Sequence, residues 1–168
     1  MKRAAVLLSL ISLSLVLPVA FSGKVLNKQG KPISPVGRYH IKPYLSVFGG
    51  ITLSFTPTGV ASPVILTGTP LNIAFLSKRP CGSSSNWVVI ADDFPQKWVG
   101  IGGPADHPGK QIIPRTFNIQ VFDFSGYKLV FCPQSGLCSN VDVARDENGN
   151  RLVLRNGYGA LKLLFADA

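Results

Sequence analysis

Short runs of the sequence alternate apolar and polar residues with a period of two, and no apolar period of 3.6 residues extends over a dozen positions. The clearest runs place apolar residues at Leu71, Ile73 and Phe75, at Phe117, Ile119 and Val121, and at Leu161, Leu163 and Phe165. Successive side chains of a strand point to opposite faces of a sheet, so this pattern predicts half-buried β-strands. The sequence therefore predicts an all-β chain.

Turn-forming residues separate these runs. Asn148-Gly149, Asn156-Gly157 and Ser125-Gly126 fall between them, and the chain has 17 glycines and 13 prolines. Many short strands with turn signals at such spacing are typical of a barrel or a sandwich.

Residues 1–22 have the features of a secretory signal peptide. Met1-Lys2-Arg3 is positively charged, residues 4–19 are rich in leucine, and Ala20-Phe21-Ser22 resembles a cleavage site. The apolar run is shorter than the ~20 residues that a membrane-spanning helix needs, so we expect no membrane association once the leader is removed. We expect residues 23–168 to form one domain, because this length is usual for a chain with a single core.

The formal net charge of the chain is +9 at pH 7. Its basic residues are scattered singly from Lys24 to Lys162 rather than gathered in a run. A nucleic-acid-binding arm would concentrate them, so we expect no nucleic-acid partner.

Residues that could carry enzyme chemistry lack the context they need. His40 and His107 are isolated from other metal ligands, and the serines of CGSSSNW at 81–87 have no nucleophile-elbow pattern. Asp92 and Asp93 are adjacent, so on a strand they would point to opposite faces. We therefore expect neither an enzyme nor a bound metal ion or cofactor.

Seven segments, taken in order, resemble the plant Kunitz soybean-trypsin-inhibitor family. They are VLNKQGKPISPVGRYHIKP at 25–43, GGITLSFTPTG at 49–59, TGTPLNIAF at 67–75, CGSSSNWVVIADD at 81–93, GIGGPADHPG at 100–109, FNIQVFDFSGYKLVFCP at 117–133 and DENGNRLVLRN at 146–156. The most specific combination is YKLVFCP, then a nearby cysteine, then NGNRLVL. The resemblance implies a β-trefoil, protease inhibition, a role in plant defence, and a secreted or vacuolar location.

The resemblance also implies a pairing for two of the three cysteines. Cys132 and Cys138 match the small downstream disulfide of the family, and the turn residues between them let the short loop close with little distortion. Cys81 normally pairs with a cysteine that follows the segment matching Thr58-Gly59. Here residues 60–66 run directly into residues 67–70, so the first lobe is shortened and that partner is deleted. We expect Cys81 to be an unpaired thiol, with a Cys81-linked dimer as the alternative.

The deletion lies beside the reactive loop that the resemblance implies. Counting back from Pro70 places the reactive bond at Ala61-Ser62. Trypsin inhibitors of the family carry Arg or Lys before this bond, whereas no basic residue occurs between Lys42 and Lys78. We therefore expect no trypsin inhibition through this loop, and Ala61 suits an elastase-like pocket.

Three further residues bear on inhibition. Pro35 occupies the place of an Asn that braces the loop in the family, and it has no side-chain donor. Lys78 and Arg79, in the segment LSKRPCG at 76–82, form an alternative inhibitory loop, and cysteine proteases are further candidate targets.

Two functions therefore remain open. The first is a protease inhibitor directed at serine or cysteine proteases. The second is a non-inhibitory binding, storage or defence protein on the same scaffold. A rigid reactive loop would favour the first and rapid nicking of residues 56–70 the second.

Overall fold

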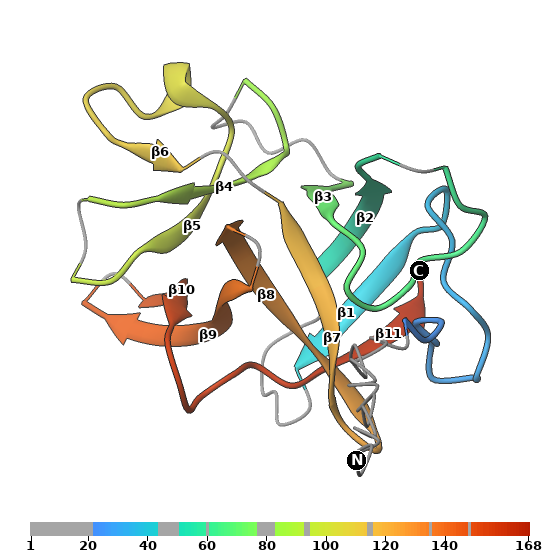
Figure 1. Cartoon of the computed structure of the whole chain (residues 1–168). Coiled ribbons are helices and arrows are strands. Elements are labelled where there is room, and N and C mark those ends of the chain that lie inside the picture. The colour runs from blue at the N-terminus through green and yellow to red at the C-terminus, as the bar shows by residue number, and fades with distance from the viewer. Residues whose placement is uncertain are drawn as a thin grey trace, which may run out of the picture.

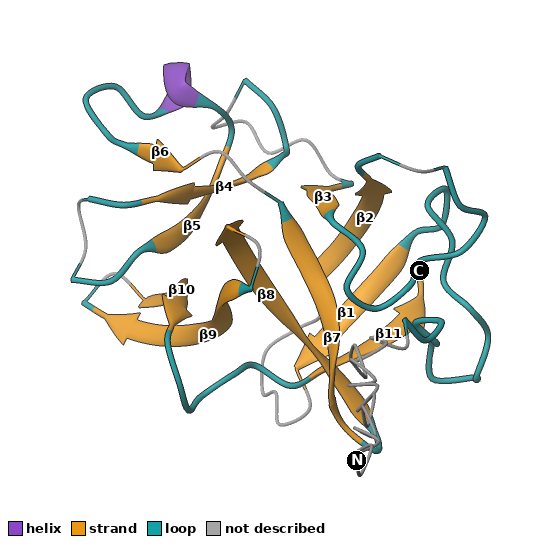
Figure 2. Cartoon of the chain, viewed as in Figure 1, coloured by secondary structure: helices purple, strands orange, loops and turns teal. Residues whose placement is uncertain are grey.

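The computed structural model describes residues 22–43, 51–59, 61–76, 83–92, 95–113, 116–134, 136–147 and 149–168. Within these residues the chain forms eleven strands and one short 3-10 helix. Figures 1 and 2 show how these elements are arranged. The all-β prediction is confirmed. The predicted signal peptide lies outside the described residues except for Ser22. No helix in the described part of the chain is long and apolar enough to cross a membrane.

The elements run in this order: β1 (Tyr39–Pro43), β2 (Ile51–Pro57), β3 (Leu71–Phe75), β4 (Trp87–Ile90), β5 (Trp98–Ile101), η1 (Pro104–Asp106), β6 (Ile112–Ile113), β7 (Phe117–Asp123), β8 (Gly126–Gln134), β9 (Leu137–Asp146), β10 (Gly149–Arg155) and β11 (Leu163–Asp167).

Six of the strands close into a ring. The pairing runs from β11 through β1, β2, β3 and β7 to β8, and β8 pairs back to β11 where Leu163 faces Tyr127. Closure pairs strands that would otherwise be exposed sheet edges. The sheet continues from β8 through β9, β10, β5 and β4 to β6. A bridge between Ala74 and Asn86 connects the start of β4 back to β3 (Figure 1).

The predicted alternation places its apolar residues in the core, with exceptions at the strand ends. Leu71, Ile73, Phe117, Ile119, Leu163 and Phe165 are buried. Val121 is 58% exposed, because it lies near the tip of the β7–β8 hairpin, beyond the last pairing of β7 with β3. Leu161 precedes β11 and bonds instead to the backbone of β9, donating its N–H to the Val141 carbonyl at 3.0 Å.

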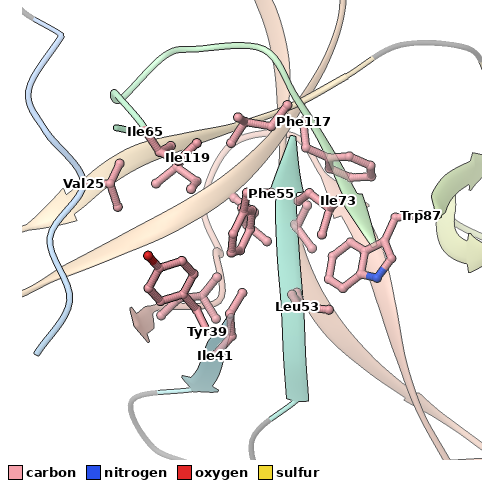
Figure 3. Close-up of a cluster of buried hydrophobic side chains, with 14 of the residues drawn as sticks. Val25, Tyr39, Ile41, Leu53, Phe55, Ile65, Ile73, Trp87, Phe117 and Ile119 are labelled. Atoms are coloured by element: carbon pink, nitrogen blue, oxygen red, sulfur yellow. The ribbon is translucent and has the colours of Figure 1, made fainter. Parts of the chain in front are cut away.

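Aromatic and aliphatic side chains pack together in the buried core (Figure 3). Phe55 of β2 is fully buried and meets Phe165 of β11 edge to face, with ring centroids 5.6 Å apart. Tyr39 of β1 also contacts Phe55, with ring centroids 6.4 Å apart. These contacts join three neighbouring strands of the ring, so Phe55 is a central packing residue of the barrel.

A polar turn fastens the N-terminal segment to the last strand. The Asn27 side-chain oxygen accepts the N–H groups of Gln29 and Lys31 at 3.0 and 2.9 Å. Its side-chain nitrogen donates to the Asp167 carboxylate at 2.9 Å. Asn27 is 7% exposed, so these bonds satisfy a buried polar group.

We predict that Phe55→Ala lowers the free energy of unfolding by about 3–5 kcal/mol, because it leaves a cavity between three strands. Urea unfolding followed by circular dichroism measures the change. Phe124→Ala is the matched control, since Phe124 is fully exposed and its removal should change the free energy by less than about 0.5 kcal/mol. Equal losses for the two variants would show that Phe55 is not central to the core.

Candidate functional site

The segment that contains Ala61 and Ser62 is the connection between β2 and β3. The two strands are antiparallel and end with Pro57 opposite Leu71. Just beyond them, the Thr58 N–H donates to the Pro70 carbonyl at 2.9 Å. Residues 58–70 therefore form one loop that is closed at its base, and we refer to it as the β2–β3 loop.

Three fully buried residues lock the middle of this loop to the N-terminal segment. The Ile33 N–H donates to the Val25 carbonyl at 2.9 Å, and the Ile65 N–H donates to the Ile33 carbonyl at 2.8 Å. The Val25 N–H completes the cycle by donating to the Ile65 carbonyl at 2.9 Å. All three side chains are 0% exposed, and Figure 3 shows Val25 and Ile65 at one side of the core. We call this arrangement the backbone triad.

Residues that follow the triad are held from two sides. Thr67 and Gly23 exchange hydrogen bonds, with the Thr67 N–H on the Gly23 carbonyl at 2.8 Å and the Gly23 N–H on Thr67 Oγ1 at 2.9 Å. The Gly68 N–H donates to the Ile119 carbonyl of β7 at 2.9 Å, and the Asn118 side chain donates to the Gly68 carbonyl at 3.2 Å. Gly68 has a φ of 77°, a conformation that favours glycine.

The proposed reactive bond lies in the exposed half of the loop. Ala61 and Pro63 are exposed, and Ser62 is half-buried. Ser62 Oγ donates to the Val64 carbonyl at 2.7 Å and accepts the Val64 N–H at 3.3 Å. A short polar turn therefore shapes residues 62–64 between the base of the loop at Thr58 and the triad.

The structure gives the loop a brace that sequence reasoning missed. Pro35 offers no side-chain donor, as expected, and it is a half-buried residue of a turn. The neighbouring Ile33 carbonyl instead holds Ile65. Main-chain groups are present at every residue, so no residue type could have revealed this brace. The sequence signal was a run of apolar residues, Val64, Ile65 and Leu66, inside a loop.

A cleft of about 660 Å³ runs beside the loop. Thr58, Ser62 and residues 66–70 line one side, and Gln120 and Val121 of β7 also contribute. All of these side chains are neutral, so the described surface next to Ala61 suits uncharged groups better than ions.

The alternative inhibitory residues, Lys78 and Arg79, lie outside the described residues, and so does Cys81. Ser83, on their C-terminal side, donates its N–H to the Asp106 carboxylate at 2.7 Å. The Ser83 hydroxyl, the Ser83 N–H and the Gly103 N–H all donate to Asp106 and hold its pKa below the usual value for an aspartate.

The histidines and cysteines of the described residues are engaged in structural bonds. His40 bonds through Nδ1 to the Thr52 hydroxyl at 2.7 Å, and His107 bonds through Nε2 to the Ile101 carbonyl at 2.9 Å. Cys132 and Cys138 form a disulfide that links β8 to β9. In this part of the chain no group of three or more His, Cys, Asp or Glu side chains is placed to hold a metal ion.

Comparisons with known proteins agree on one family. The model of the legume Kunitz family, described as trypsin and protease inhibitor, matches residues 45–166. The chain is 34% identical to a subtilisin inhibitor, CLSI-II, from Canavalia lineata, over 86% of this chain and 92% of the relative. It is 30% identical to the Kunitz-type elastase inhibitor BrEI from Bauhinia rufa, over 65% of this chain and 96% of the relative.

A solved structure extends the agreement to the fold. The crystal structure of a Kunitz type trypsin inhibitor from Cicer arietinum superposes with a TM-score of 0.78 at 34% identity. The superposition covers 86% of this chain and 98% of the Cicer inhibitor chain. The alignment with the Canavalia relative is 175 residues long, although it includes only 86% of a 168-residue chain. It therefore contains gaps on the side of this chain, as a shortened member of the family requires. The chain belongs to the legume Kunitz family of trypsin and protease inhibitors, and it is a Kunitz-type inhibitor-like protein with the β-trefoil fold.

Proposed function

We propose that the β2–β3 loop inhibits a serine protease with a small primary pocket, of the elastase or subtilisin type. The observation that carries this proposal is the position of Ala61, which is exposed on a loop whose base and middle are held by main-chain hydrogen bonds. The named relatives add support, since one is a subtilisin inhibitor and another an elastase inhibitor.

The mechanism depends on how little the loop must change on binding. A loop already ordered in its bound shape loses little conformational entropy when the protease binds. If the protease cleaves the Ala61–Ser62 bond, the Thr58–Pro70 bond on one side and the backbone triad on the other retain both ends. The ends can then be rejoined, and the enzyme remains occupied.

The side chain at position 61 sets the target. A methyl group fills a small apolar pocket, but it cannot pair with the carboxylate at the base of the trypsin pocket. Ala61 therefore favours an elastase-type or subtilisin-type enzyme over trypsin.

A second candidate function, a non-inhibitory binding, storage or defence protein, is favoured by one observation. Among the described residues, the hydrogen bonds of residues 61–64 all lie within the loop and come from Ser62 and Val64. A protease that strains this half of the loop would meet no bracing side chain from position 35.

We further propose that the protein enters the secretory pathway and loses residues 1–22 there, which leads to an extracellular or vacuolar location. Expression in a plant cell with the native leader should give a chain that begins at Gly23. Intact mass of the recovered protein tests this, and retention of the leader would contradict it.

We predict that the purified protein inhibits elastase or subtilisin stoichiometrically and leaves trypsin active. Ala61→Arg should transfer inhibition to trypsin and weaken elastase inhibition by about a hundredfold or more, because the charged side chain pairs with the carboxylate of the trypsin pocket and does not fit a small one. Residual activity of elastase, subtilisin, trypsin, chymotrypsin and papain, titrated with each variant, measures this.

Lys78→Ala and Arg79→Ala are the controls for this titration, and both should leave elastase and subtilisin inhibition unchanged. If either abolishes inhibition and Ala61→Arg does not alter it, the segment at 76–82 is the inhibitory loop. Inhibition of papain alone would show that the protein inhibits cysteine proteases rather than serine proteases. If every enzyme stays active and residues 56–70 are cut, the non-inhibitory function is correct.

Ser62→Ala tests the rigidity of the loop. Loss of the hydroxyl removes both bonds to Val64, so we expect cleavage of the Ala61–Ser62 bond to accelerate by about tenfold. Mass spectrometry of samples taken during incubation with subtilisin gives the rate. Ser62→Thr keeps the hydroxyl and should behave like the unmodified chain. Equal cleavage rates for the Ala and Thr variants would show that these bonds do not order the loop.

A further inference from the structure

The tip of the β7–β8 hairpin carries apolar side chains that the core does not cover. Phe124 is fully exposed, and Val121 and Phe122 are 58% and 43% exposed. Leu26 of the N-terminal segment is 37% exposed and lines one groove together with Val121 and Phe124. Figure 1 shows the hairpin projecting from the barrel at the bottom of the view, away from β4, β5 and β6. We call these four residues the apolar tip.

Hydrogen bonds hold the turn of this hairpin in shape. Asp123 Oδ1 accepts the Ser125 N–H at 2.9 Å and the Ser125 hydroxyl at 3.2 Å, on either side of Phe124. Lys162 Nζ donates to Asp123 Oδ2 at 2.7 Å and to Ser125 Oγ at 2.8 Å. An ordered turn therefore presents Phe124 to the solvent. Exposed apolar residues that gather in one place, unlike those scattered singly, indicate an interaction surface.

Lysines lie beside the apolar tip. Lys28 lines the same groove as Leu26 and Phe124. Lys24 and Lys31 are exposed on the same N-terminal segment. This segment therefore adds positive charge along one side of the tip.

The carboxylates of this surface are already bonded. Asp123 pairs with Lys162 at 2.7 Å, and Asp167 accepts the Asn27 side chain at 2.9 Å. Lys162 Nζ also lies 6.0 Å from the centroid of the Phe122 ring. The four lysines and two aspartates named here, all among the described residues, leave a surplus of two positive charges. An anionic partner is therefore favoured.

The shape of the tip decides between a protein and a membrane as that partner. A protein partner needs a surface complementary in shape to each protruding side chain. A lipid surface accepts a protruding aromatic ring without a preformed pocket, and its anionic headgroups attract neighbouring lysines. A fully exposed ring at the end of a hairpin suits the lipid surface better.

We propose that the apolar tip binds membrane surfaces rich in anionic phospholipids, with Phe124 entering between the headgroups and Lys24, Lys28 and Lys31 beside the phosphates. The expectation of no membrane association considered only runs long enough to span a membrane, and binding at the interface needs no such run. The proposal is independent of protease inhibition, because Phe124 lies outside the β2–β3 loop and the cleft beside it.

Vesicle sedimentation tests the proposal. The chain that begins at Gly23 is used, because the apolar leader would itself bind lipid, and cooperative urea unfolding confirms that the chain is folded. It should sediment with vesicles of equal parts phosphatidylglycerol and phosphatidylcholine. It should stay in solution with phosphatidylcholine alone, and high salt should release it from the mixed vesicles, because salt screens the attraction of the lysines.

Phe124→Ala should weaken binding to the mixed vesicles by about tenfold, because one apolar ring no longer leaves water. Tyr158→Ala is the matched control, since Tyr158 is also fully exposed and lies in the connection between β10 and β11. Lys28→Ala should weaken binding by about fivefold. Lys97→Ala removes an exposed lysine next to β5 and should change binding by less than about twofold.

A tryptophan substitution separates insertion from adsorption. Phe124→Trp should shift its emission to shorter wavelength on the mixed vesicles and be quenched by brominated lipid. Tyr158→Trp should do neither, and it accounts for the signal of Trp87 and Trp98, which both variants retain.

Three results would overturn the proposal. They are absence of binding to the mixed vesicles, equal losses for Phe124→Ala and Tyr158→Ala, and unchanged Phe124→Trp emission on bound protein. If no vesicle binds and Phe124→Ala instead weakens inhibition of a protease, the tip is a protein contact and the proposal is wrong.

Discussion

The pairing of β1 with β11 joins the first strand of the ring to the last, and the support of the β2–β3 loop depends on it. Five residue pairs, from Tyr39–Asp167 to Pro43–Leu163, form this contact. The Lys28 N–H then donates to the Phe165 carbonyl at 2.8 Å, which fixes the N-terminal segment against β11. That segment supplies two of the three residues of the backbone triad. Opening the β1–β11 contact would therefore loosen the loop without touching it.

Local patterns predicted the strands well, because alternation and turn residues act over a few positions. β3, β7 and most of β11 follow the predicted runs, and burial departs from the pattern only where a hairpin tip or strand end leaves the barrel, as at Val121. Ring closure is different. It joins residues far apart in the chain, and the β-trefoil was predicted from the ordered family segments rather than from periodicity.

The candidate site, like the fold, could be predicted from the sequence only in part. Counting back from Pro70 predicted a reactive bond at Ala61-Ser62. Ala61 is exposed in the structure, and its role in inhibition stays a prediction. The triad could not be predicted, because its bonds use main-chain atoms of Val25, Ile33 and Ile65.

Main-chain anchoring has a consequence for how this family diversifies. Because the triad and the Thr58–Pro70 bond use backbone N–H and carbonyl groups, replacing the side chains at positions 61–64 leaves those bonds intact. Selection can then exchange the exposed Ala61 almost freely, whereas Ser62 also shapes residues 62–64 through its hydroxyl. Each exchange at position 61 presents a new surface on an unchanged support. The barrel is in this sense a grafting scaffold, in which a few consecutive residues evolve at their own rate while the buried strands stay under a separate constraint.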